Sequence, residues 1–443
     1  MSRAVCFVIM PFGVKPDASG RAIDFDAVFR DIIAPAVKHA GFDVVRADQE
    51  MGSGLIHKAM FERLLLSEYA IADLTIPNAN VYYELGVRHA VRPQSTVLLS
   101  AEASRLPFDV GNLQAWPYAL DAAGRPANAA KDSRELGRQL EYAKVHDEPD
   151  SPLFKLLDGF KPPEVAHEKT DLFRREIIRS RAVREQLLLA KDAGLPALDA
   201  MRDDLGEIAA VEAGLVVSIY LAYRDVKAWD RMIDLHKCMD PVLAHTILVR
   251  EQHAFALNRA GRGGEAERVL LDLIKERGGQ SETYGLLGRI YKDRWRAAKA
   301  AKDAFSARGF LDKAVEAYRR GFESDSRDAF PGINAATLME IARPGDPAVK
   351  DLVPVVRYAA ERKIARGAGD YWDHATLLEL AVLERDEART GVALSHAMAE
   401  RGGIDSWAPA STAANLQDIA EARRAAGEDV AGLEAVVRAL EGR

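Results

Sequence analysis

The chain has 443 residues, a length that predicts two or three domains. Hydrophobic residues make up 48% and charged residues 29%, as in ordinary soluble globular proteins, and the net charge of −7 argues against nucleic-acid binding by bulk electrostatics. The two cysteines, Cys6 and Cys238, exclude a disulfide framework and favour a reducing cytoplasm. No apolar run approaches the ~20 residues of a membrane span, and the apolar stretch 4–10 is too short for a signal peptide.

Apolar runs alternate with amphipathic stretches through the first part of the chain. In the stretch 25–40 apolar residues recur at the helical period, and Gly41 ends it. The alternation predicts a mainly parallel sheet covered by helices on both faces. The stretch 109–132, with scattered Gly, Pro and Asn, is expected to be irregular. Strands are predicted at 5–10, 42–47, 70–74 and 97–99, and helices at 25–40, 55–68, 80–90 and 132–143.

After about residue 165 the pattern is helical throughout. Arg250 and Tyr284 are 34 residues apart, as are Ala254 and Gly288, and this is the tetratricopeptide period. Residues 295–307 then read as an insertion in the second unit. The spacing favours a tetratricopeptide-like solenoid over a generic all-α domain. The predicted domains are an α/β domain at 1–145, a helical connector at 146–190 and helical repeats at 191–443.

Parallel sheets bind ligands beyond the carboxyl ends of their strands, and this rule selects the candidate binding residues. The Gly52-Ser53-Gly54 turn opens a helix and has amides for a phosphate, but it lacks the lysine of a P-loop, so a flexible loop with a serine cap is the alternative. The candidates at strand ends are Met10, Pro11, Phe12, Gly13, Asp48, Gly52, Ser53 and Asp73.

Two carboxylates are the candidate catalytic groups. Glu84 lies near the start of the helix predicted at 80–90, where the helix dipole favours an ionised carboxylate. Such a group can attack or stabilise a ribosyl carbon as positive charge develops, and Asp73 can orient the base or exchange a proton with it. The alternative is that both residues only cap a helix and a turn.

The residues around Glu84 add further candidates. Asn78 or Asn80 is expected to cap the helix. Arg88 is predicted to pair with Glu84 or to contact a phosphate, and Tyr83 to stack on a base or wall the cleft. The histidines show no metal-ligand spacing, and no metal or cofactor is expected.

The runs Cys6–Phe12, Ile71–Thr75 and Asn78–Gly86 resemble the nucleoside 2-deoxyribosyltransferase-like superfamily, which is related in fold to TIR domains. The resemblance covers roughly residues 4–120. It implies a flavodoxin-like sheet that cleaves N-glycosidic bonds of nucleosides or NAD, with Glu84 as the catalytic glutamate and Asp73 holding or protonating the base. Met10-Pro11-Phe12 departs from the transferase pattern and favours hydrolysis over transfer.

The whole layout resembles the regulatory region of apoptosis signal-regulating kinases and bacterial proteins that carry a TRAF-binding domain. One reading is an N-glycosidic bond hydrolase, acting on NAD or a nucleotide as substrate in bacterial antiviral defence, with a helical-repeat region that binds a protein partner. The alternative is a non-catalytic scaffold that senses a nucleotide or binds proteins. A homo-oligomer is expected in either case, without membrane or bulk nucleic-acid binding.

Overall fold

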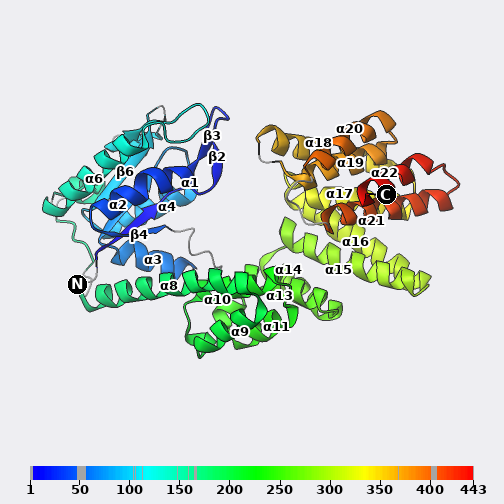
Figure 1. Cartoon of the computed structure of the whole chain (residues 1–443), viewed down its shortest axis with the longest axis horizontal. Helices are drawn as coiled ribbons and strands as arrows, with labels where there is room; N and C mark the ends of the chain where they lie inside the picture. The colour runs from blue at the N-terminus through cyan, green and yellow to red at the C-terminus, as the bar shows by residue number, and fades with distance from the viewer. Residues whose placement is uncertain are drawn as a thin grey trace. The chain divides into compact units, whose positions relative to one another are not determined.

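The structure is a computed structural model that describes residues 3–46, 56–102, 104, 106–111, 113–146, 148–157, 159–163, 167–367, 369–400 and 407–442. The chain forms two compact units, Met1–Val249 and Arg250–Arg443, called here the N-terminal and the C-terminal unit (Figure 1). In the described residues, the N-terminal unit holds a parallel sheet with helices, and the C-terminal unit is helical. This confirms an α/β region followed by a mainly helical region.

Five parallel strands form the sheet of the N-terminal unit. Their spatial order is β4-β1-β5-β6-β7, which becomes 2-1-3-4-5 when these five strands are counted alone, the order of flavodoxin-like sheets. The winding direction changes between β1 and β5, so the crevice expected of such folds lies at the carboxyl ends of those two strands. The strands are β1 Val5–Ile9, β4 Asp43–Arg46, β5 Tyr69–Asp73, β6 Thr96–Ala101 and β7 Ala115–Tyr118.

Strand β7 and a small hairpin correct the sequence prediction. β7 lies inside the stretch 109–132, which was expected to be irregular, because Pro117 argues against a strand. Among the described strands β7 is the edge of the sheet and pairs with β6 alone, and an edge strand is where a sheet tolerates proline. The antiparallel hairpin of β2 (Val14–Pro16) and β3 (Ala22–Asp24) was not predicted, since its short, mostly exposed strands lack an apolar alternation.

The first predicted helix forms as three consecutive segments, α1 (Phe25–Val28), a π-helical turn η1 (Phe29–Ile33) and α2 (Ala34–His39). Asp24 caps its start by accepting a hydrogen bond from the Ala27 N–H at 2.9 Å. The π turn ends just before Pro35, which has no N–H and so cannot donate a hydrogen bond to a carbonyl of the preceding turn.

Helices cover both faces of the sheet. On one face α1, η1, α2 and α6 (Ala129–Val145) pack against the apolar side chains of the strands, and on the other face α3 (Ile56–Leu66) and α4 (Ala79–Val91) do so. Burial of these two apolar clusters is the main driving force for this arrangement. The core residues that the helices contribute include Phe25, Val28, Ile32, Leu136 and Leu140 on the first face, and Leu64, Val81 and Leu85 on the second.

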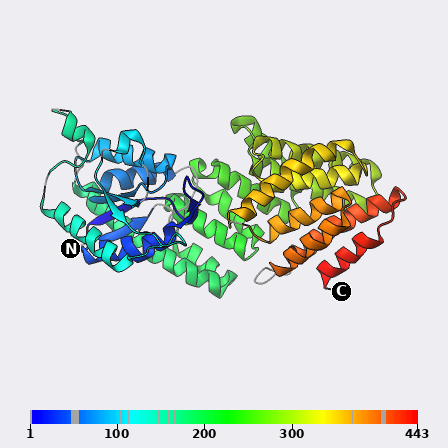
Figure 2. The same ribbon diagram turned by 90° about the horizontal axis from the view of Figure 1, so that it is seen from above.

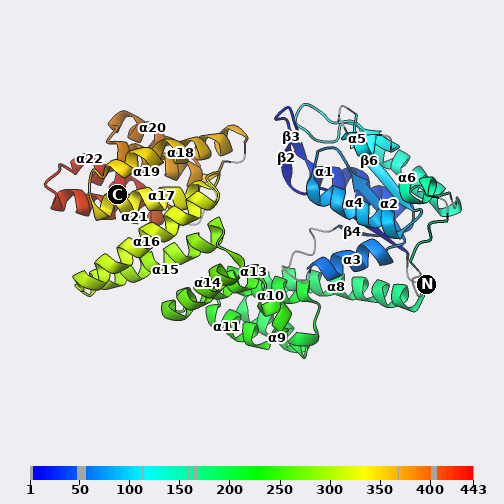
Figure 3. The same ribbon diagram turned by 180° about the vertical axis from the view of Figure 1, so that it is seen from behind.

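The long helix α8 (His167–Ala193) continues the N-terminal unit beyond the sheet and runs beside α3 (Figure 3). Phe173 of α8 is buried in the same cluster as Leu64 and Leu85. The core of the sheet region therefore includes a side chain from the segment that was predicted as a connector, 146–190. The remaining helices of this unit are α5 Phe108–Gly111, α7 Pro152–Leu156, α9 Leu195–Asp204, η3 Ile208–Ala210, α10 Ala213–Asp225, α11 Trp229–Cys238 and α12 Pro241–Ala244.

From α14 to α20 consecutive helices of the C-terminal unit pack against one another, and α21 packs against α22 (Figure 2). One core cluster of the unit draws apolar side chains from α16 to α22. The helices are α13 Ile247–Arg259, which begins at the unit boundary, α14 Gly263–Arg277, α15 Ser281–Ala300, α16 Ala304–Ser324, α17 Ala329–Ala342, α18 Pro347–Ala365, α19 Tyr371–Glu384, α20 Glu387–Ala399, α21 Trp407–Ala425 and α22 Ala431–Glu441. Among the described residues, no helix is both long and apolar enough to cross a membrane.

Gly288 allows α15 and α16 to approach closely, and its replacement tests this packing. A Cβ atom at Gly288 would lie 2.8 Å from the Tyr318 ring, which is fully buried. We expect Gly288→Ala to lower the free energy of unfolding of the C-terminal unit by about 1–3 kcal/mol, measured by urea denaturation. Gly309 of α16 is the matched control, because a Cβ there meets nothing within 4 Å. Gly309→Ala should stabilise by about 0.5–1 kcal/mol, and equal effects of the two changes would contradict the close contact.

Candidate functional site

The structure brings Met10 and Asp73 to the same edge of the sheet. The register pairs Ile9 with Ala72, so the next positions, Met10 and Asp73, are neighbours at the carboxyl ends of β1 and β5. Met10 is 5% exposed and Pro11 is buried, whereas Phe12 is half exposed. The predicted candidates Asp48, Gly52 and Ser53 lie outside the described residues.

Gly13 makes the turn that leads from β1 into the hairpin. Its φ of +67° is in the left-handed region that glycine tolerates best. Its N–H donates to Asp26 Oδ1 at 3.2 Å, and its carbonyl accepts from the Phe25 N–H at 3.1 Å. Arg46 at the end of β4 pairs with the same Asp26 oxygen at 2.9 Å. Gly13 and Asp26 thus tie the hairpin and the first helix to the end of the sheet.

Asp73 is fully buried, and both its carboxylate oxygens accept hydrogen bonds. The Thr75 N–H donates to Oδ1 and the Tyr118 hydroxyl to Oδ2, each at 2.9 Å. Thr75 Oγ1 lies 2.7 Å from the Tyr118 hydroxyl and accepts from the Ala101 N–H at 2.9 Å. Burial raises the pKa of Asp73, while the bonds from Thr75 and Tyr118 oppose that rise. The Asp73 carboxylate therefore connects β5 with β7, and the Thr75 hydroxyl adds the link to β6.

Sequence reasoning did not find Tyr118, because its strand was read as irregular. The signal was present as the apolar run 115–120, which contains only one proline. Tyr118 is 1% exposed, and its hydroxyl is hydrogen bonded, as expected for a buried tyrosine.

Asn78 is the N-cap of α4, which resolves the choice between the two predicted asparagines. Its side-chain oxygen accepts from the N–H groups of Asn80 at 3.0 Å and Val81 at 3.3 Å. Tyr83, in the second turn of α4, is 56% exposed and meets Phe61 edge-on, with 6.5 Å between the ring centroids. The cap satisfies amides that would otherwise be free at the helix start.

Arg88 corrects the prediction that it pairs with Glu84 or contacts a phosphate. It is completely buried, and its five N–H donors all have partners inside the protein. Burial lowers the pKa of Arg88 to about 9. The guanidinium therefore holds the end of α3 and the start of β6 together, leaving no donor for Glu84. Its acceptors are the carbonyls of Leu64, Ser67 and Glu68 and the hydroxyls of Ser95 and Thr96, at 2.8 to 3.2 Å.

Glu84 is partly buried, and loss of hydration raises its pKa to about 7. We expect Glu84→Gln to raise the free energy of unfolding at pH 8 by about 1–3 kcal/mol and to leave it unchanged at pH 4. The sign follows because a carboxyl with a raised folded-state pKa loses stability as the pH rises from about 4.5 through 7. Urea denaturation at the two pH values measures the difference. An unchanged stability at pH 8 would contradict the burial of this carboxyl.

A second polar site lies in the C-terminal unit, where a buried network joins four helices. Lys292 of α15 is 2% exposed, and its ammonium donates to Asn334 Oδ1 of α17 and Asn415 Oδ1 of α21, both at 2.9 Å. Glu379 of α19 accepts from the Asn415 amide at 3.1 Å and from the Thr337 hydroxyl at 2.9 Å. Burial lowers the pKa of Lys292 to about 7 and raises the pKa of Glu379. Buried polar groups that are satisfied in this way fix how helices pack.

Ion pairs extend the contact of α15 with α21 toward the end of α15. Arg296 pairs with Asp418 at 2.7 Å, and Lys299 pairs with Asp418 at 3.3 Å and Glu421 at 2.7 Å. The cations are spaced along one side of α15, and the carboxylates along one side of α21. Beyond Lys299 this end of α15 forms an open hollow with α16, described below. The sequence motifs pointed to none of these pairs, because the partners are more than 100 residues apart.

Residues 81–437, more than half of the chain, match the family model described as the MAP3K TRAFs-binding domain. The chain belongs to this family. The match begins inside α4 and runs through β6, β7 and the helices up to α22. Membership of the MAP3K TRAFs-binding family confirms the predicted likeness to a kinase regulatory region that carries a TRAF-binding domain.

Curated relatives of this MAP3K TRAFs-binding family member are kinases. The mitogen-activated protein kinase kinase kinase nsy-1 of Caenorhabditis elegans is 31% identical over 42% of this chain and 13% of its own length. Mitogen-activated protein kinase kinase kinase 5 is 26% identical in Homo sapiens, over 38% of this chain and 12% of its own. The same kinase in Mus musculus is 27% identical, over 40% of this chain and 13% of its own. The chain thus spans about an eighth of the length of the curated relatives it matches.

These findings correct the prediction of a TIR-like NADase or hydrolase in antiviral defence. The family is a MAP3K TRAFs-binding domain, and the relatives are protein kinases of the MAP3K class rather than defence hydrolases. The local geometry agrees with this correction at Arg88, which has no donor left for a substrate phosphate. The catalytic roles given to Glu84 and Asp73 stay predictions from the sequence.

Proposed function

We propose that this chain is a non-catalytic signalling scaffold whose helical region binds a partner protein. The observation that carries the proposal is the family match, which includes the helices from α8 to α21 and most of α22. The family's description supports a TRAF-type adaptor as the first candidate partner. A rigid helical array suits this role because paired helices expose long, continuous surfaces for protein contacts.

We further propose that the C-terminal unit is a degenerate tetratricopeptide-like array. Hydrogen bonds between α13 and α15 support the 34-residue spacing, since Glu251 accepts from Thr283 and Asn258 donates to Asp293. The two residues of each pair are 32 and 35 positions apart in the sequence. Helices α13 and α15 therefore run parallel to each other, offset in sequence by close to one 34-residue repeat. Later helices are less regular, and Thr337 and Glu379 are 42 residues apart.

Titration calorimetry of the full chain against purified TRAF domains tests the scaffold proposal. We expect micromolar or tighter binding, and we expect the Glu84→Gln variant to bind equally well because Glu84 lies in the sheet region. Absence of binding to every TRAF domain, for a chain that is folded by circular dichroism, would contradict the proposed partner. Loss of binding in Glu84→Gln alone would place the partner on the sheet region instead.

Nucleotide binding and homo-oligomer formation, both expected from the sequence, stay predictions. A nucleotide bound without chemistry would lie beyond β1 and β5, near Met10 and Phe12. Calorimetry with NAD and nucleoside phosphates measures the first prediction, and light scattering after size-exclusion chromatography measures the second.

A further inference from the structure

The end of the α15–α16 hairpin concentrates positive charge in an acidic protein. The stretch 289–313 contains eight Lys or Arg residues and three Asp, whereas the whole chain has a net charge of −7. Lys292 is buried, and four of the other cations pair with carboxylates of α14 and α21, namely Arg294, Arg296, Lys299 and Lys313. This stretch contains the predicted insertion 295–307, and the extra residues lengthen α15 and α16 themselves. Figure 3 shows this end of the hairpin at an outer edge of the C-terminal unit. Charge of one sign gathered at such a place steers ligands of the opposite sign.

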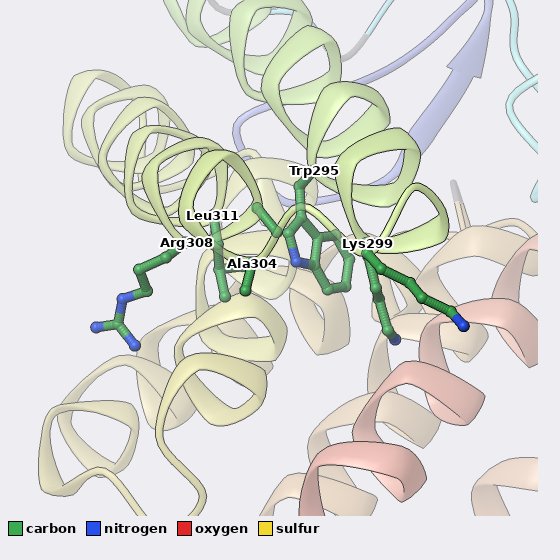
Figure 4. Close-up of a pocket in the computed structure, with 7 residues that line it drawn as sticks. Trp295, Lys299, Ala304, Arg308 and Leu311 are labelled. Carbon is green, nitrogen blue, oxygen red and sulfur yellow. The ribbon is translucent and has the colours of Figure 1, made fainter.

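A hollow of about 340 Å³ lies between the two helices at this end. Trp295 and Leu311 are buried in its wall, at 4% and 6% exposure, and Ala304 adds a small apolar surface. Figure 4 shows Trp295, Leu311 and Ala304 grouped together, with Lys299 and Arg308 on either side of them. Among the described residues that line the hollow, the charged ones are all cations, namely Lys299, Lys302 and Arg308. An apolar wall with a few convergent charges is typical of binding hollows.

The hairpin already binds carboxylates on one of its sides. Lys299 holds Asp418 and Glu421 of α21 in the ion pairs described above. On the other side of the hairpin the cationic side chains are more exposed to solvent. Lys302 is exposed, and within the part of the chain that the structure describes Arg308 pairs only with Asp312, one helical turn away at 3.3 Å, with both side chains more than half exposed. Such exposed pairs contribute little and exchange readily for a new partner.

Phe305 extends this surface with an exposed aromatic ring. It is 94% exposed, in the first turn of α16, and three residues before Arg308, so the two side chains lie on the same side of the helix. Aromatic and arginine side chains are the groups that most often dominate binding at protein interfaces.

We propose that this hairpin end is the docking surface for an acidic segment of a partner protein. An apolar side chain of the partner packs against Trp295 and Leu311, its carboxylates pair with Lys302 and Arg308, and Phe305 covers the segment. The inference rests on the proposed scaffold function and specifies the chemistry of the partner. Nucleic acid is the weaker candidate, because the apolar wall of the hollow suits the apolar side chain of a peptide better than a chain of phosphates.

Fluorescence polarisation of a labelled peptide with the full chain tests this surface. The probe is a short peptide of alternating glutamate and serine around a central leucine. We expect it to bind, to bind at least about tenfold more weakly to the K302E/R308E double variant, and to be released by salt. Phe305→Ser should also weaken binding. The matched control is Lys350→Glu, an exposed lysine of α18 on the same unit, which should bind as the wild type does.

Control probes complete the experiment. A peptide with glutamine in place of glutamate should bind more weakly, and single-stranded DNA of equal charge should not compete. The inference is overturned if the acidic peptide does not bind, if the double variant binds like the wild type, or if DNA competes equally. The assay contains no TRAF domain, so its failure refutes the acidic docking surface alone, while the calorimetric titration tests the scaffold proposal separately.

Discussion

Replacing Arg88 with methionine is expected to lower the free energy of unfolding of the N-terminal unit by about 3–5 kcal/mol. The side chain is completely buried and donates five hydrogen bonds, three of them to main-chain carbonyls of the α3–β5 connection and the end of α3. Methionine fills part of the space but donates no hydrogen bond. The carbonyls of Leu64, Ser67 and Glu68 would therefore stay buried without the donors that Arg88 provides. Urea denaturation measures the loss.

Two further variants show whether the donors or the bulk of Arg88 matter. Arg88→Lys keeps the charge but has three donors in place of five, so its stability should lie between the wild type and Arg88→Met. Arg30→Ala is the control, because Arg30 is mostly exposed and pairs with the adjacent Asp31. It should change stability by less than about 0.5 kcal/mol. A similar small effect of Arg88→Met would show that the five bonds do not stabilise the fold.

Raising the pH from 7 to 9 is expected to increase the free energy of unfolding of the C-terminal unit by about 2 kcal/mol through Lys292. Burial lowers the pKa of this lysine to about 7 in the folded chain, compared with 10.5 for an ordinary lysine. Between these values the unfolded chain binds the proton and the folded chain releases it, so stability rises with pH. Arg296 and Arg289 act with burial, while Glu379 and Asp418 oppose it.

Lys292→Met should remove this increase and flatten the pH dependence, measured by urea denaturation at pH 7, 8 and 9. Glu379→Gln separates the opposing group, because burial raises the pKa of Glu379 and its ionisation destabilises the fold as the pH rises. Lys350→Met changes a lysine that is exposed, and it should keep the wild-type slope. A slope that persists in Lys292→Met would assign the pH dependence to other groups.

The alternation of apolar runs was sufficient to predict the α/β region, because buried parallel strands are continuous apolar segments such as Val5–Ile9 and Thr96–Ala101. Local rules also predicted Asn78 as a possible cap and Gly41 as a helix end. They failed at β7, where Pro117 hides an edge strand, and at the exposed hairpin β2–β3, whose pairing has no apolar signature.

The candidate site was harder to predict than the fold, since spacing does not show where a side chain's hydrogen bonds go. Arg88 is four residues after Glu84, which suggested a helix-surface pair, but the helix turns Arg88 inward to five acceptors contributed by two other segments. Tyr118 and Asp73 are 45 residues apart, and only the sheet order brings them together. The functional reading followed the motif around Glu84, whereas the family match begins at residue 81, inside α4, and extends over β6, β7 and the helices as far as α22.

The single side chain of Phe173 has a consequence for how such proteins can be rearranged by recombination. Because this ring fills part of the apolar layer beneath the sheet, a gene break placed between the sheet and α8 would leave a gap in that layer. A sheet region that moved to a new tail would therefore have to carry the first turns of α8 with it. The segment that is inherited intact would then be longer than the segment that forms the sheet.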